Sequence, residues 1–259
     1  MAASLLLVSQ LNAQVPADVA RERAGFAEWL GTAANSPMVV RGLAAIGPRI
    51  RIGPADAEIP LPGVDAQIRE VGGTVTIDGS LGSRVLPRNR LTDLGEFSLF
   101  LSGVPGKSIV TVYGGERKQQ TPEYYPYDPT KVFIGPLHPT EPRRFPTLAL
   151  DGLEVEATEV GTVVIPDGTG PTRLRVYRIP DQSGEESELM IYFRDGTSGK
   201  GSYPAGRFVT LHPVEGGKYR LDLNRAQNPF CAYRSAYPCP APWPGNTLTM
   251  MVEAGERYH

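Results

Sequence analysis

The sequence is poor in the residues that build metal and nucleophile sites, with two cysteines and three histidines among 259 residues. Cys231 and Cys239 do not form a Cys-x-x-Cys motif, and we predict no metal site. His138 and His212 each precede a proline and belong to no recognisable acid–base motif. Ser198 lies in Gly-Thr-Ser-Gly instead of Gly-x-Ser-x-Gly, so the pattern of a nucleophilic serine is missing.

The sequence also lacks an excess of one charge and a long apolar run. The formal net charge is −2 at pH 7, and no basic stripe with interleaved aromatic residues occurs, which argues against nucleic acid as a partner. No apolar run approaches the roughly 20 residues that cross a bilayer, so we expect no membrane span in the mature chain. No cofactor fingerprint is present, and we predict no cofactor. An unknown small molecule stays open as a partner, and the sequence does not indicate an oligomeric state.

The first residues are apolar. Residues 2–8 read Ala-Ala-Ser-Leu-Leu-Leu-Val and are followed by Leu-Asn-Ala-Gln, a pattern typical of the apolar part of a signal peptide and its small-residue cleavage site. The usual preceding basic residues are missing. We therefore expect residues 1–14 to be a truncated signal peptide, or alternatively an apolar N-terminal segment. The first interpretation predicts export to the periplasm or the extracellular space, with the cytoplasm as the alternative, and export permits a disulfide.

Glycine and proline are plentiful, at 29 and 25 residues, which indicates many turns and short elements. One helix is expected from Asp18 to about Ala34, with Asp18 as its N-cap and Pro37 just beyond its end. After Pro37, short alternating runs such as 73–78 are bounded by Gly, Pro, Asn or Asp. This pattern predicts a mainly β fold, with antiparallel sheets in a sandwich or barrel-like arrangement and one N-terminal α-helix.

We expect residues 15–259 to form a single β-rich domain. Residues 119–146 are rich in proline and tyrosine and are predicted as an ordered loop across a sheet, with a short strand at 131–134. This segment is a candidate seam between subdomains. Further strands are expected directly afterwards, including 147–156 and, near the end, 247–252.

Polar residues, cysteines and prolines gather in the last quarter, where we place the site. The predicted ligand-binding residues are Arg194, Asp195, Thr197, Ser198, Tyr203, Arg207, Asp222, Asn224, Asn228 and Asn246. A strand over 218–224 would put Arg220, Asp222 and Asn224 on one face. That face either lies in solvent or lines the rim of a cavity. Arg194 or Arg207 could equally meet Asp222 as a buried structural ion pair.

The segment from Asp195 to Gly199 is predicted to be a turn in which the Asp195 side chain accepts hydrogen bonds from the amides of Thr197 or Ser198. Successive amides in such a turn can hold a carboxylate or a phosphate. The alternative is a tight turn without a ligand.

Three interpretations fit Cys231 and Cys239. We favour a local disulfide, which would stabilise the fold by roughly 2–3 kcal/mol on the chain-entropy model. A zinc site would need two further ligands, and a catalytic thiol at Cys231 would need a base and an electropositive pocket. The prolines at 229 and 238–244 fix the backbone of this loop.

Two classes of function remain open. The first is a binding or structural module without turnover, indicated by the lack of a complete catalytic motif. The second is a hydrolase or lyase with Asp195 or Asp222 as acid/base and Arg194 or Arg207 stabilising an anion. The sequence does not decide whether the protein is an enzyme.

Several segments together resemble one known family. They are residues 193–199 (Phe-Arg-Asp-Gly-Thr-Ser-Gly), 203–208, 221–233, the Cys-Pro-Ala-Pro run that begins at Cys239, Asn246 and residues 254–256 (Ala-Gly-Glu). This order of rare residues is similar to the signature of the domain of unknown function 1684 family, which is found in bacteria and archaea. The resemblance covers roughly the whole mature chain, more loosely before residue 180. It implies the extent of a domain and the location of a site, but no chemistry.

Overall fold

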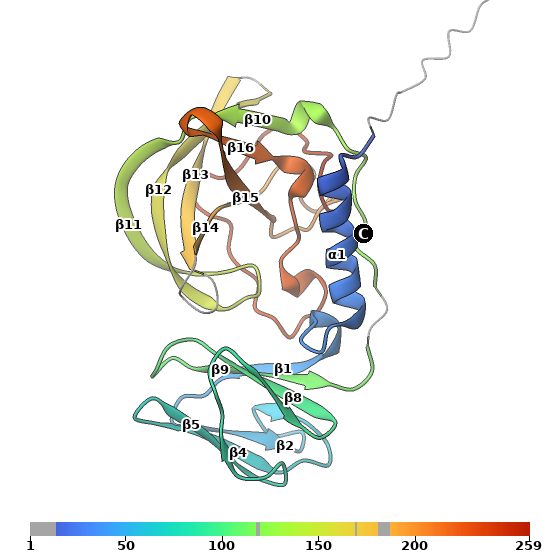
Figure 1. The fold of residues 1–259 in the computed structure, drawn as a ribbon, viewed down its shortest axis with the longest axis vertical. Coiled ribbons are helices and arrows are strands. Elements are labelled where there is room, and N and C mark those ends of the chain that lie inside the picture. The colour runs from blue at the N-terminus through green and yellow to red at the C-terminus, as the bar shows by residue number, and fades with distance from the viewer. Residues whose placement is uncertain (1–13, 118–119, 169, 181–186) are drawn as a thin grey trace, which may run out of the picture.

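The computed structural model describes residues 14–117, 120–168, 170–180 and 187–259 (Figure 1). It confirms the predicted fold class, because antiparallel strands dominate and one α-helix, α1 (Ala17–Thr32), precedes them. In the described residues none of the three sheets closes into a barrel. The described helices also lack the length and apolarity of a membrane-spanning helix.

Two sheets pack face to face in the first half of the chain, and we call them the N-terminal sandwich. The four-stranded sheet has the order β1-β9-β8-β7 and consists of β1 (Val40–Ala45), β7 (Leu91–Leu94), β8 (Phe97–Ser102) and β9 (Ile109–Gly114). The five-stranded sheet has the order β3-β2-β4-β5-β6 and consists of β2 (Arg49–Gly53), β3 (Ile59–Pro60), β4 (Ala66–Val71), β5 (Thr74–Gly79) and β6 (Arg84–Val85). Alternate residues of both sheets, such as Ile52, Ile77 and Val112, point into one shared apolar core.

The second half of the chain forms the seven-stranded C-terminal sheet, with the order β10-β16-β15-β14-β13-β12-β11. Its strands are β10 (Val132–Gly135), β11 (His138–Leu148), β12 (Glu154–Asp167), β13 (Gly170–Pro180), β14 (Ser187–Phe193), β15 (Arg207–Val214) and β16 (Lys218–Asp222). Short 3-10 helices lie at η1 (Pro37–Val39), η2 (Pro129–Lys131), η3 (Glu215–Gly217), η4 (Leu223–Arg225) and η5 (Phe230–Ala232).

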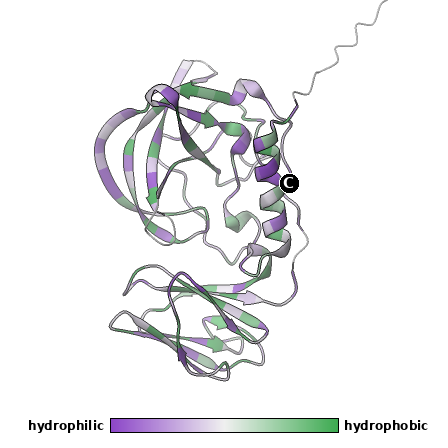
Figure 2. Cartoon of the chain, viewed as in Figure 1, coloured by the Kyte–Doolittle hydropathy of each residue, from purple (hydrophilic) through white to green (hydrophobic). Residues whose placement is uncertain are grey.

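Each face of the C-terminal sheet has its own apolar cluster. Leu174 and Ile191 belong to the cluster that also includes Leu248 and Val252 of the chain's last segment. On the other face, Trp243 packs against the ring of Tyr177, with the ring centroids 4.1 Å apart. The hydropathy colours follow this arrangement, with apolar residues on the strands of both halves (Figure 2). The irregular segment after β16 therefore covers the sheet.

The N-terminal sandwich and the C-terminal sheet have separate apolar cores, formed by residues 46–112 and by residues after 156. The prediction of a single domain over residues 15–259, with a seam at 119–146, stays a prediction. The described part of the proline-rich segment contains both β10 and the start of β11.

The helix bounds differ from expectation at both ends. Pro16 is the N-cap, so Asp18 lies inside the first turn, where its carboxylate pairs with Arg225 instead of capping the helix. The helix ends at Thr32 because Ala33 takes an extended conformation. Asp18 is thus part of a tertiary contact that helix signals in the sequence do not indicate.

Strand β11 corrects the predicted loop. It is an 11-residue strand that includes prolines 139, 142 and 146. Because β11 lies at the edge of the sheet, a proline there removes no hydrogen bond from the interior of the sheet. The strand expected at 147–156 is consequently divided into the end of β11, a turn and the start of β12.

The strand expected at 247–252 does not form. Thr247 makes an isolated bridge to Arg194, and the rest of the segment is irregular. Its backbone groups bond to side chains instead: Asp167 accepts from the Met250 amide and Asp195 from the Val252 amide. These side chains replace the partner that a sheet would have supplied.

Candidate functional site

A buried ion pair lies at the centre of the predicted site. Asp195 lies two residues beyond the end of β14 and Arg207 opens β15, so the antiparallel pairing of these strands brings the two side chains together. The Arg207 Nη2 atom lies 2.7 Å from Asp195 Oδ2, and both side chains are 1% exposed. Arg207 therefore forms a buried ion pair, but with Asp195 and not with the predicted partner Asp222.

This pair bonds the backbone of the chain's last segment. Arg207 donates to the carbonyl oxygens of Val252 at 2.9 Å, Ala254 at 2.5 Å and Glu256 at 3.1 Å. Asp195 Oδ1 accepts from the Val252 amide at 3.3 Å. Both partners of the pair are thus engaged by protein groups and buried from solvent.

The turn after Asp195 is likewise bonded internally. Asp195 Oδ1 accepts from the amide and the hydroxyl of Thr197 at 2.6 and 2.5 Å. The amides of Ser198, Gly199 and Lys200 donate to carbonyl oxygens of the same turn region. This geometry favours the tight-turn alternative over an anion cradle made of these amides, because their donors are already engaged.

Asp222 and Asn224 form a second buried network, and neither lies in solvent. Asp222 Oδ1 accepts from the amide and the side-chain nitrogen of Asn224, each at 3.0 Å. Asp222 Oδ2 faces Arg220 at 3.3 Å and Arg225 at 3.4 Å. Asn224 in turn pairs with the amide and carbonyl of Asp128, each at 2.8 Å. The network fixes the end of β16 to the segment that leads into β10.

The same network reaches α1. Arg225 pairs with Asp18 and Glu22 on the first turns of the helix. Arg23 donates to the Asn224 carbonyl at 3.1 Å, and its guanidinium lies 4.3 Å from the centre of the Tyr124 ring. Asp195 and Asp222 consequently belong to different networks, and the structure does not bring them together as a catalytic pair of carboxylates.

Glu256 is a buried carboxyl that is missing from the predicted set. Its Oε2 accepts from the Asn228 amide at 2.8 Å, and its Oε1 accepts from the Tyr233 hydroxyl. Burial raises the pKa of Glu256 to about 7, against the lowering effect of these hydrogen bonds and of Arg207. Burial and the adjacent Glu256 also raise the pKa of Tyr233. The sequence feature that could have pointed to Glu256 is its place in the closing Ala-Gly-Glu of the family signature.

Asn246 and Asp167 attach the irregular cover to the sheet. Asn246 accepts from the Arg175 amide at 2.8 Å and donates to the Arg175 carbonyl at 3.0 Å, as a neighbouring strand would. Asp167 accepts from the amides of Thr249 and Met250, at 2.9 and 2.7 Å. Sequence reasoning missed Asp167, because Pro-Asp-Gly at 166–168 indicates only a turn.

The two cysteines lie at disulfide distance, with their Cα atoms 5.6 Å apart. The Tyr203 hydroxyl lies 3.3 Å from both sulfur atoms. Cys231 is buried and Cys239 is exposed. Within the described ranges no cluster of His, Cys, Asp or Glu could hold a metal ion.

Arg194 lies apart from the buried networks. It is exposed, and its backbone pairs with the cover through the Asn246 carbonyl at 2.9 Å and the Leu248 amide at 2.8 Å. The Asp195 carboxylate is bonded to Arg207 instead. Within the described residues no ion pair joins Arg194 to Asp222, its predicted partner, or to Asp195.

A hollow of about 410 Å³ adjoins the Asp195–Arg207 network. Its lining residues come from the turn after β14 and from the end of the chain: Gly199, Lys200, Gly201, Ser202, Pro204, Arg257, Tyr258 and His259. The Ser202 hydroxyl lies 2.8 Å from that of Thr197, which connects the hollow to the buried pair. Gly201 has φ +129°, and a Cβ atom there would lie 2.5 Å from the Tyr125 hydroxyl, so this wall requires glycine.

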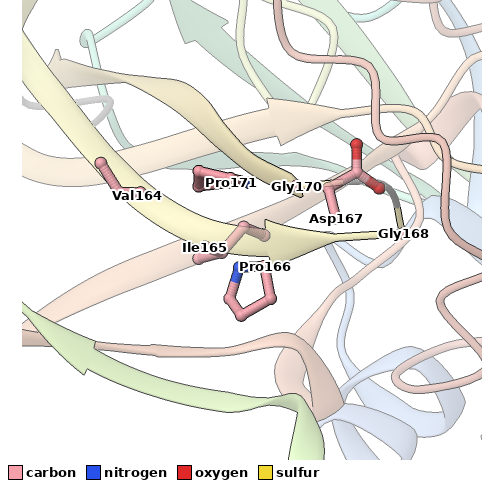
Figure 3. Close-up of a pocket in the computed structure, with 7 residues that line it drawn as sticks. All are labelled: Val164, Ile165, Pro166, Asp167, Gly168, Gly170 and Pro171. Carbon is pink, nitrogen blue, oxygen red and sulfur yellow. The ribbon is translucent and has the colours of Figure 1, made fainter.

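A second hollow, of about 420 Å³, lies at the β12–β13 turn (Figure 3). Its lining is Val164, Ile165, Pro166, Asp167, Gly168, Gly170 and Pro171. Among its described lining residues the one ionisable group is Asp167, whose carboxylate accepts hydrogen bonds from Thr172, Thr249 and Met250. The hollow thus offers little to orient a polar ligand.

Comparison with known proteins identifies a family for this chain. The model of "Protein of unknown function (DUF1684)" matches residues 119–257. Among solved structures, the chain is similar to an uncharacterized protein of Haloarcula marismortui, determined in solution by NMR; the two are 32% identical over 53% of this chain and 76% of that one, with a TM-score of 0.45. No curated protein matches the chain. The chain belongs to the DUF1684 family of proteins of unknown function.

Proposed function

We propose that this protein is an exported binding module without turnover, and that its C-terminal quarter binds a small anion. The observation that carries this proposal is the hollow beside Ser202, where Lys200 and Arg257 contribute positive charge from two separate segments. Convergent cations in a concave site are the usual means of recognising a carboxylate or a phosphate.

The arrangement of Arg257 supports this assignment. Its guanidinium lies 5.2 Å from the centre of the Tyr125 ring, which orients the side chain. Its Nε atom is buried and has no hydrogen-bond partner within the parts of the chain that the structure describes. His259 also lines the hollow and lies 3.0 Å from Glu123, so an acidic side chain adjoins the site. Lys200 and Arg257 are therefore the groups we assign to the anion.

Binding is favoured over catalysis because the carboxylates of the expected acids are already hydrogen-bonded by protein groups. Asp195 and Asp222 carry hydrogen bonds from protein groups on both carboxylate oxygens. A general acid or base must reach the proton that it transfers, either directly or through one water. Export is supported by the apolar first residues and by two cysteines at disulfide distance.

Isothermal titration calorimetry with inorganic phosphate and a dicarboxylate tests the anion site, with glucose as the neutral control. We expect Lys200→Met to weaken binding about tenfold, the loss of one charge-assisted hydrogen bond. Lys218→Met, which changes an exposed lysine outside the lining, should bind as the wild type does. Added salt should weaken binding. Anions that give no heat, or equal binding by both variants, would refute the site.

A further inference from the structure

The loop between Cys231 and Cys239 lies where the N-terminal sandwich meets the C-terminal sheet, and we call these two parts the lobes. One apolar cluster joins residues of both lobes, with Val39, Val40 and Tyr113 on one side and Cys231 and Tyr237 on the other. In Figure 1 the orange-red segment after β16 reaches down toward β1 and the turn that precedes it. This cluster is the inter-lobe joint.

Polar contacts reinforce the joint from the sandwich side. Arg234 Nε donates to the Val40 carbonyl at 3.1 Å. The hydroxyl groups of Tyr113 and Tyr237 are hydrogen-bonded to each other, and burial raises the pKa of Tyr113 to about 12. The loop thus contributes an arginine and a tyrosine to the contact in addition to its apolar surface.

The other side of the loop is fixed to the C-terminal sheet. The Phe230 amide donates to the Leu150 carbonyl at 2.9 Å, in the turn between β11 and β12. Tyr203 lies in the segment between β14 and β15, and its hydroxyl contacts both sulfur atoms. The loop is therefore held by one lobe and presented to the other.

The cores of the two lobes do not include this loop. The sandwich core is built from residues 46–112, and the core that contains Ile191 and Val209 has no member between 227 and 247. Each core can persist when the loop loosens, since apolar burial within each lobe is unaffected. Tyr233 of the loop packs with Leu30 and Met38. No loop residue belongs to the sandwich core or to the two clusters of the C-terminal sheet. The loop thus determines how the lobes meet and contributes no side chain to these three clusters.

We propose that the Cys231–Cys239 disulfide holds the inter-lobe joint closed, and that its reduction releases the joint without unfolding either lobe. Cys239 is exposed, so a reductant reaches the bond from solvent. A dithiol supplies two electrons and two protons: the S–S bond breaks, two thiols form, and the dithiol closes to its own disulfide. The loop is then no longer cross-linked, and it samples conformations in which Arg234 and Tyr237 leave the sandwich.

Hydrogen exchange measured by mass spectrometry on the full chain, with and without dithiothreitol, tests this proposal. Reduction should accelerate exchange about tenfold or more in peptides covering 36–41 and 229–239. Peptides from β4, β5, β13 and β14 should keep their protection. Unchanged exchange in the joint peptides would overturn the proposal, and so would lost protection in the strands of both lobes.

The double variant Cys231→Ser/Cys239→Ser provides the matched control. Without reductant it should show the fast exchange of the reduced wild type, and dithiothreitol should not change it further. A dithiothreitol effect of the same size in this variant would show that the reductant acts elsewhere and would refute the joint. If the variant does not fold, the comparison of oxidised and reduced wild type still decides the question.

Discussion

The N-terminal sandwich and the C-terminal sheet are both mainly antiparallel, yet they bury different kinds of side chain. In the sandwich two sheets cover each other, and the interior is a continuous set of aliphatic and aromatic residues. In the C-terminal half one sheet is covered by an irregular segment, and the buried set includes Asp167, Asp195, Arg207, Asp222 and Glu256. The difference lies in the cover: a strand satisfies its own backbone groups by pairing, whereas an irregular cover needs side chains to do so.

This comparison explains why the last quarter resembles an active site in composition. Charged and amide side chains there serve as backbone partners for segment 246–256, as Arg207 does for three carbonyl groups. A density of Asp, Asn and Arg can therefore mark an irregular cover as well as a catalytic centre. The candidate ligand site lies at the edge of this network, in the hollow beside Lys200.

The largest expected effect in the sandwich comes from its core. Ile52→Ala removes a fully buried side chain between the two sheets and should lower the free energy of unfolding by about 2–5 kcal/mol. Urea denaturation measures the loss. Val71→Ala, at a position that is 76% exposed, should change stability by no more than about 0.5 kcal/mol. Equal losses in the two variants would contradict the account of the sandwich core.

Asn246→Ala tests the cover with a smaller expected effect. The substitution leaves the backbone groups of Arg175 without their partner and should cost about 1–3 kcal/mol. Asn35→Ala changes an exposed asparagine and serves as the control. Hydrogen exchange should accelerate at 246–252 in the Asn246 variant alone. Full protection of that segment would show that the cover does not depend on this side chain.

The fold class was predictable because alternation of apolar residues is a local signal, as in 73–78, which forms most of β5. The strand β11 could not be predicted, because a segment rich in proline indicates a loop unless its position at the edge of a sheet is known. The pairing of Asp195 with Arg207 depends on the register of β14 and β15, which no local pattern contains. The ligand hollow could not be placed either, since its walls join residues 199–204 to residues 257–259.

Stability should also depend on pH through Glu256. The folded pKa of Glu256 is raised to about 7 from its ordinary 4.5, so between these values the folded protein holds a proton that the unfolded chain releases. The contribution of Glu256 to the free energy of unfolding is therefore full below about pH 4.5, falls as pH rises toward 7, and levels off above.

Urea denaturation at several pH values measures this slope. Glu256→Gln should flatten it, because glutamine does not titrate. Glu253→Gln, at an exposed position nearby, should leave the slope as it is in the wild type. If the unfolding free energy depends on pH equally in the two variants, Glu256 is not the group that causes this dependence.

The central claim, that the polar signature holds the cover in place, is tested most directly at the Asp195–Arg207 pair. Urea denaturation of Arg207→Met, Asp195→Asn and the double variant gives the coupling between them, with exposed Arg194→Met as the control. We predict that Arg207→Met loses about 3–5 kcal/mol, because it leaves a buried carboxylate without its partner, and that the double variant loses clearly less than the two single losses combined. An Arg207→Met protein as stable as the control variant would contradict the account.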